Sequence, residues 1–96
     1  MKKGEGMQVS EGERRAGLLA RRLEERGIAV AIRGSLVSVV GGRRLWAEIE
    51  RRAPGLPARM ADGRLWVDAG ELPDEEIARA AEAIARAFRD VEGLVV

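Results

Sequence analysis

The sequence contains no histidine, cysteine, tyrosine, threonine or asparagine, and it has only one glutamine and two lysines. These absences remove most side chains that act as nucleophiles, as general bases near neutral pH or as ligands for soft metals. No hydrophobic run reaches the length of about 20 residues that a transmembrane helix needs. Carboxylates, 15 arginines, three serines and two tryptophans are left to carry any function.

What is present is typical of a small soluble globular protein. Hydrophobic residues make up 46% of the 96 residues and charged residues 34%, which is enough apolar surface for one core. The first six residues are charged and rich in glycine, so we expect no signal peptide and a cytoplasmic location. The scarcity of thermolabile side chains is typical of a thermophile, although a GC-rich genome gives a similar alanine and arginine bias.

The net charge of +1 is unevenly spread along the chain. Residues 33–64 carry seven arginines and three acidic residues, whereas residues 65–96 carry three arginines and eight acidic residues. A solvated, salt-bridged surface would explain this distribution. A basic middle region that meets an anionic partner would also explain it, as would a head-to-tail contact between neighbouring subunits.

The first half of the chain predicts a helix followed by a β-hairpin. Ser10 and Glu13 have the spacing of a capping box at the start of a helix over 11–26. β-Branched residues alternate with other residues over 28–32 and 36–40, and a tight glycine turn joins the two segments. Alternation assigns one set of side chains to the core: Ile28, Val30, Ile32, Val37 and Val39.

The second half repeats the order of helix, strand and strand. A helix is predicted over 43–53, where a Pro-Gly pair follows it. The dipeptide Asp62-Gly63 is a strong hairpin signal between strands at 58–61 and 64–67. A two-residue turn there aligns the core-facing residues in two pairs: Met60 with Leu65, and Ala58 with Val67.

The last helix has the clearest pattern in the chain. Pro73 and three acidic residues open it, apolar residues follow the 3.6-residue period, and Gly93 ends it. The final residues 94–96 allow a short C-terminal strand. We therefore predict a flexible segment over 1–10 and one α+β domain over 11–96. The domain is a two-layer sandwich, with a largely antiparallel sheet of four or five strands and about three helices mainly on one face, in the order α-β-β-α-β-β-α.

No catalytic or metal-binding constellation is visible in the sequence. The three serines have no histidine to activate them, and Lys2 and Lys3 lie in the N-terminal segment. Acidic pairs such as Asp68 with Glu71 come just before a helix and are typical of caps. We predict no catalytic residue, cofactor site or metal site. An enzyme or small-molecule regulatory module would have to rely on carboxylates and arginines.

The second face of the predicted sheet gathers the residues of greatest functional interest. Strand alternation places Trp66 there with Arg59 and Arg64. At the start of the second helix, two glycines precede two arginines, an arrangement that can hold a phosphate, although a glycine turn followed by solvated arginines is the simpler interpretation. The predicted interaction or anion-binding surface comprises Arg33, Leu36, Arg43, Arg44, Arg59, Arg64 and Trp66.

Three interpretations of this face remain open. An uncovered apolar patch can pack against a second copy, with Trp66 as the anchor of a homodimer. The second helix or the N-terminal segment can instead cover Trp66 and make it part of the core. Single-stranded RNA or DNA can also stack on Trp66, with its phosphates on the arginines. Our leading hypothesis is a non-catalytic cytoplasmic interaction domain that forms a homodimer, with no membrane partner. The alternative is a small RNA- or DNA-binding domain.

Overall fold

The computed structural model describes the backbone of residues 10–95 and the side chains of residues 10–91. Its order of elements is the predicted one, and the predicted α+β fold is confirmed. Residues 1–9 of the predicted flexible segment and Val96 lie outside the described residues. The elements are α1 (Glu11–Glu25), β1 (Val30–Arg33), β2 (Leu36–Val40), α2 (Arg43–Arg52), β3 (Ala58–Ala61), β4 (Arg64–Asp68), the short 3₁₀ helix η2 (Ala69–Glu71) and α3 (Asp74–Val95).

The four strands form one antiparallel sheet in the order β1-β2-β4-β3. The β3–β4 hairpin turns at Asp62 and Gly63, whose φ angles of 55° and 72° are the positive values that a type I′ turn requires. This turn fixes the register of the hairpin. Two cross-strand pairs have the predicted register: Met60 with Leu65, and Ala58 with Val67.

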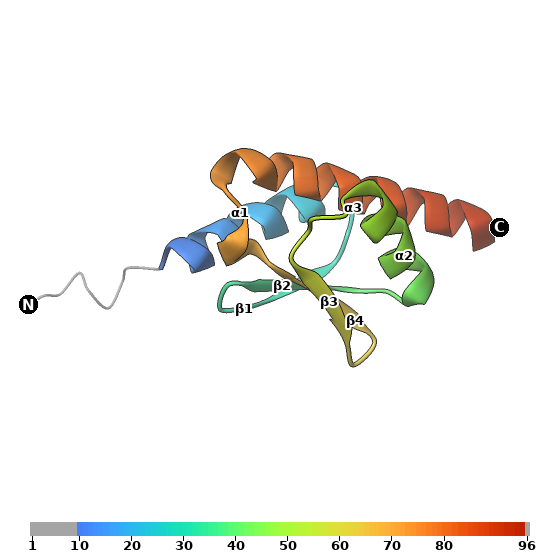
Figure 1. Ribbon diagram of the computed structural model, residues 1–96, viewed down its shortest axis with the longest axis horizontal. Coiled ribbons are helices and arrows are strands. Elements are labelled where there is room, and N and C mark those ends of the chain that lie inside the picture. The colour runs from blue at the N-terminus through green and yellow to red at the C-terminus, as the bar shows by residue number, and fades with distance from the viewer. Residues whose placement is uncertain (1–9, 96) are drawn as a thin grey trace, which may run out of the picture.

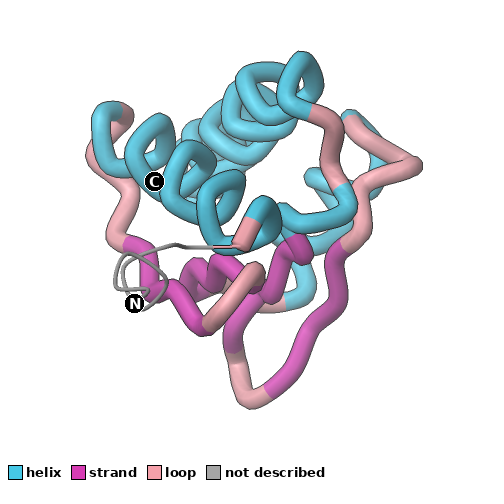
Figure 2. The backbone as a smooth tube through the Cα atoms, turned by 90° about the vertical axis from the view of Figure 1, so that its left-hand side faces the viewer, coloured by secondary structure: helices cyan, strands magenta, loops and turns pink. Residues whose placement is uncertain are grey.

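All three α-helices lie on one side of the sheet, and no helix covers the opposite side of the described structure (Figure 1, Figure 2). Helices α1 and α2 both pack against α3. The core lies between this helix layer and the sheet, with side chains from every α-helix and from the two central strands. The largest fully buried apolar side chains are Leu19, Leu23, Val37, Val39, Ile49, Leu65, Val67, Ile77 and Ile84.

One predicted core residue, Ile32, has 52% of its surface exposed. The prediction that Ile32 is buried is therefore wrong, although its cross-strand partner Val37 is buried on the same side of the sheet. The difference arises because β1 is an edge strand, which has a strand neighbour on one flank only. Alternation identifies the side of a strand that faces the helices, but it does not show how far the helices reach.

The last helix continues to Val95, so the predicted helix end at Gly93 and the predicted strand that begins at Leu94 are wrong. Glycine inside a helix costs about 1 kcal/mol relative to alanine. That cost is small for a helix of 22 residues whose second half is held to the core by Phe88 and Val91. The 3.6-residue period of apolar residues therefore indicated the extent of this helix better than the position of its single glycine did.

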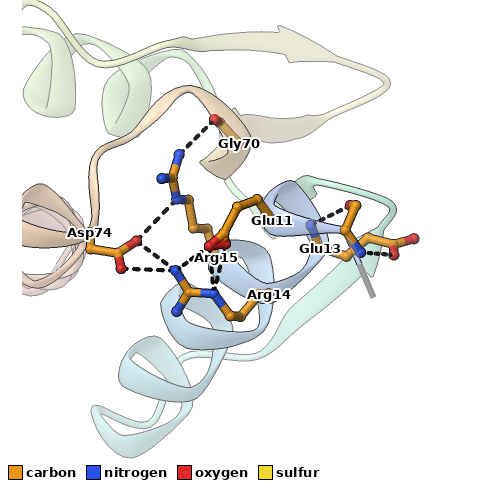
Figure 3. A network of polar contacts seen from close by, with 7 residues as sticks. Glu11, Glu13, Arg14, Arg15, Gly70 and Asp74 are labelled. Atoms are coloured by element: carbon orange, nitrogen blue, oxygen red, sulfur yellow. Dashed lines mark hydrogen bonds and ion pairs between the residues drawn. The ribbon is translucent and has the colours of Figure 1, made fainter. Parts of the chain in front are cut away.

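The first helix begins with the predicted capping box. The Ser10 hydroxyl accepts a hydrogen bond from the Glu13 amide, and the Glu13 carboxylate accepts one from the Ser10 amide, both at 3.1 Å. Figure 3 shows this cap near a second contact, in which Arg14 and Arg15 donate to Asp74 at the start of α3. Arg14 first, and then Arg15, lower the pKa of Asp74. These side chains are partly exposed to solvent, which screens their charges, so the ion pairs connect α1 to α3 but add little stability.

A further ion pair makes the contact between α1 and α3 sensitive to pH. The Glu82 carboxylate on α3 accepts hydrogen bonds from Arg26, just after α1, and from Arg86. The bond from Arg26, followed by the bond from Arg86, lowers the pKa of Glu82 from 4.5 to about 2. Because the folded state favours the ionised carboxylate, the stability that it contributes is complete above about pH 4.5 and is lost as the pH falls through about 2.

We expect Glu82→Gln to lower the free energy of unfolding modestly at neutral pH. This effect should disappear below about pH 2, where the wild-type carboxylate becomes protonated and is then neutral like the amide. Urea unfolding of both proteins across this pH range measures the difference. High salt should reduce it, since the groups are partly exposed and ions screen them. A stability difference that stays constant with pH would contradict this expectation.

Candidate functional site

The face of the sheet turned away from the helices holds most of the predicted interaction surface. Trp66 on β4 lies opposite Ser38 on β2 and Arg59 on β3. Because side chains alternate along a strand, the residues two positions away share this face. We call it the open face, and its described members are Ala31, Arg33, Leu36, Ser38, Val40, Arg59, Ala61, Arg64, Trp66 and Asp68.

Trp66 is half-buried on the open face, and two contacts hold its indole ring. The Arg33 guanidinium lies over the ring, with 5.3 Å from its central carbon to the ring centroid. This distance is within the range of a cation–π contact. The indole N–H donates to the carbonyl oxygen of Ala61 at 3.3 Å, which ties the ring to the β3–β4 hairpin. A cation stacked on an aromatic ring therefore occupies the centre of the face.

Arg64 is held on the same face by Ser38. Its Nε–H donates to the Ser38 hydroxyl at 2.8 Å. Ser38 is fully buried, so this bond satisfies a polar group that would otherwise be costly to bury. A guanidinium has five N–H donors, and this contact uses one of them. The other donors of Arg64 remain available to a ligand, on a side chain that is partly fixed in position.

The arginines of the open face differ from those of the helix layer in their partners. Within the described part of the chain, the ion pairs are formed by six arginines that lie on or beside the helices: Arg14, Arg15, Arg26, Arg51, Arg52 and Arg86. Arg33, Arg59 and Arg64 form no ion pair with any residue of that part. These three guanidinium groups are therefore not engaged in ion pairs with described carboxylates, and Arg33 and Arg59 line a hollow beside Trp66.

Two hollows flank the Trp66 ring. The first is lined by residues that include Arg33, Arg59 and Asp62. The second has a volume of about 470 Å³, and its lining includes Arg59, Asp68 and Glu71 beside the ring. Both hollows are open to solvent at the surface of the sheet. A flat ligand held at Trp66 would therefore meet guanidinium groups and carboxylates on both sides, with one carboxylate in the first hollow and two in the second.

The carboxylates of the second hollow were not among the predicted site residues. Asp68 is oriented by two hydrogen bonds at 3.1 Å, one from the Ser35 hydroxyl and one from the amide of Gly70. Glu71 ends the 3₁₀ helix η2, which brings it back toward the sheet. The alternation that placed Trp66 on this face also places Asp68 there. No local signal predicted η2, so the position of Glu71 was not visible in the sequence.

The structure separates Arg43 and Arg44 from the rest of the predicted surface. They start α2 and line a different, mostly apolar hollow with Val40, Phe88 and Val91. Gly42 precedes them as the N-cap and provides no side-chain cap. The two arginines therefore lie beyond the end of β2, whereas Arg33, Leu36, Arg59, Arg64 and Trp66 come together on the open face.

The interpretation that α2 covers Trp66 is wrong, because α2 lies in the helix layer (Figure 1) and buries Leu45 and Ile49 in the core on the other side of the sheet. The other proposed cover for Trp66 was the N-terminal segment, and residues 1–9 of that segment lie outside the described residues.

Residues 10–95 include no helix that is long and apolar enough to cross a membrane. They also contain no group of three or more acidic residues placed to bind a metal ion. No known family model, curated protein or solved structure matches this chain.

Proposed function

We propose that this domain is a non-catalytic module that binds single-stranded nucleic acid on its open face. One observation carries the proposal: Arg33, Arg59 and Arg64 surround Trp66 and have no acidic partner among the described residues. An aromatic ring with unneutralised guanidinium groups is the pairing that single strands require, since bases stack and phosphates need cations.

The chemistry of the face assigns a role to each group. A base can stack on the outer plane of the Arg33 guanidinium, or on the indole after Arg33 moves to a phosphate. Arg59 and Arg64 then hold the phosphates next to the stacked base. Arg59 is the cross-strand partner of Trp66 on β3, and Arg64 lies two residues before Trp66 on β4, on the same face. A broad sheet face cannot enter the major groove of a duplex, whereas it can accept the exposed bases of a single strand.

Self-association through the same face is the second candidate. It is favoured by Val40, which has 62% of its surface exposed, and by the other apolar members of the face. A two-fold dimer brings identical surfaces together, so it would double the three arginines of the open face within one interface. Like charges in an interface oppose association unless carboxylates offset them, and Asp68 is the single carboxylate among the open-face residues defined above, against three arginines. For this reason we place nucleic-acid binding first.

The test follows the fluorescence of Trp66 while a single strand is added. A Trp46→Phe variant leaves Trp66 as the only tryptophan, so its emission reports on the open face alone. We expect ten-nucleotide single strands to quench it, and a duplex of the same sequence to bind more weakly. With about three phosphates neutralised, the plot of log K against log salt should have a slope of about −2.

Matched arginine variants identify the surface that binds. Arg59→Gln should reduce the magnitude of the salt slope by about 0.7, while Arg22→Gln, on the exposed side of α1, should leave the slope unchanged. Absence of quenching at low salt would reject stacking at Trp66. If light scattering then gave twice the mass of 10.4 kDa, self-association would become the better-supported function.

A further inference from the structure

The hollow between Trp66 and Glu71 has a mixed charge that phosphate binding does not explain. Arg59 contributes a guanidinium to its lining, whereas Asp68 and Glu71 contribute carboxylates. Carboxylates repel phosphate groups, so a surface for the sugar–phosphate backbone alone would work better without them. Carboxylates do accept hydrogen bonds from N–H groups, and each nucleobase presents a different set of these at its edge. The mixed charge therefore indicates recognition of a base.

The two carboxylates differ in how many acceptor positions they have free. One oxygen of Asp68, Oδ1, already accepts hydrogen bonds from Ser35 and from Gly70. Asp68 is therefore oriented, but it does not have both oxygens free. The exposed Glu71 carboxylate accepts no hydrogen bond from the described residues. Glu71 can thus offer both oxygens side by side to a ligand in the hollow.

Only one common base matches a carboxylate with two free oxygens. Guanine presents two adjacent donors on its Watson–Crick edge, at N1–H and at the N2 amino group. Adenine and cytosine present a donor beside an acceptor, and uracil or thymine presents one donor between two acceptors. An acceptor of the base placed against a carboxylate is repelled, so a two-bond contact forms with guanine alone.

We propose that the open face selects guanine, with the base stacked at Trp66 and its Watson–Crick edge on the Glu71 carboxylate. Arg59, which also lines the hollow, can hold the phosphate of the same nucleotide. Asp68 serves as a fixed neighbouring acceptor. This inference rests on the proposed function, because it specifies the base that a bound single strand presents at Trp66.

The experiment compares nine-nucleotide strands of uridine in which only the central base differs. The protein is the full chain with the Trp46→Phe substitution, and quenching of Trp66 gives each dissociation constant. We expect a central guanine to bind roughly tenfold more tightly than uracil, adenine or cytosine. Inosine lacks the N2 amino group of guanine, so it should lose most of this preference. Equal affinity for all strands, with salt-dependent binding intact, would overturn the selectivity and leave the proposed function standing. Absence of binding by every strand would overturn both.

Two acid variants test the assignment to Glu71. Glu71→Gln keeps the size of the side chain but replaces one acceptor with a donor, so the guanine preference should fall to about twofold or less. Binding of the all-uridine strand should stay equal or become tighter, because a negative charge near the phosphates is removed. Glu75→Gln, in the first turn of α3, removes the same charge from an exposed site and should keep the full preference. A guanine preference that survives Glu71→Gln would overturn the role of Glu71.

Discussion

Replacing Trp66 with alanine should weaken single-strand binding by roughly 5- to 150-fold, because stacking of one base on an aromatic ring contributes about 1–3 kcal/mol. The indole is the only aromatic group of the open face within the described residues, so no second ring can replace it. Fluorescence anisotropy of a labelled strand measures the loss, since this variant no longer carries the Trp66 reporter. Far-UV circular dichroism confirms that the variant is folded.

The control for this variant is the second tryptophan. Trp46 on α2 packs against the core in the helix layer, so Trp46→Phe should leave the dissociation constant within about twofold of the wild-type value. Arg33→Lys adds a finer test, because lysine keeps the charge but has no planar group to stack. It should weaken binding while the salt slope stays the same. If Trp66→Ala and Trp46→Phe bound equally well, stacking on the open face would be excluded.

The sequence predicted the features of this fold that depend on neighbouring residues. Asp62 and Gly63 accept positive φ angles, so the turn and the register of its hairpin followed from two residues. Once that register was known, alternation placed Trp66 and Arg59 on one face. The capping box was predictable for the same reason, because it depends only on Ser10 and on Glu13, three residues later. In each case the distance between cause and effect along the chain was a few residues.

Features that depend on packing between distant segments were not predicted. The exposure of Ile32 depends on how far the helices extend over the edge strand β1. The contact between Arg33 and Trp66 joins residues on strands that are not adjacent, since β2 lies between β1 and β4. The position of Glu71 depends on η2, where Ala69 is buried and its amide donates to the carbonyl oxygen of Ser35 at 2.9 Å. Alternation and helical period carry no information on such contacts.

Two adjacent leucines on α1 provide a direct test of the core. Leu19 is fully buried between the helices and the sheet, whereas Leu18 has 36% of its surface exposed. Leu19→Ala should lower the free energy of unfolding by about 2–5 kcal/mol, since it removes buried methyl groups and leaves a cavity. A domain of this length has a total stability at the lower end of about 5–15 kcal/mol, so the variant should be near its folding limit. Urea unfolding followed by circular dichroism measures the change.

Leu18→Ala is the matched control, because it makes the same substitution in the same turn of the same helix. Helix propensity and the unfolded state change equally in the two variants, so their difference isolates burial. Leu18→Ala should cost less than about 1 kcal/mol, as expected for a partly exposed side chain. Both leucines belong to α1, which lies in the helix layer on the side of the sheet away from Trp66, so the folded fraction of either variant should bind single strands as the wild type does. Equal losses of stability from the two substitutions would show that α1 does not pack against the sheet through Leu19.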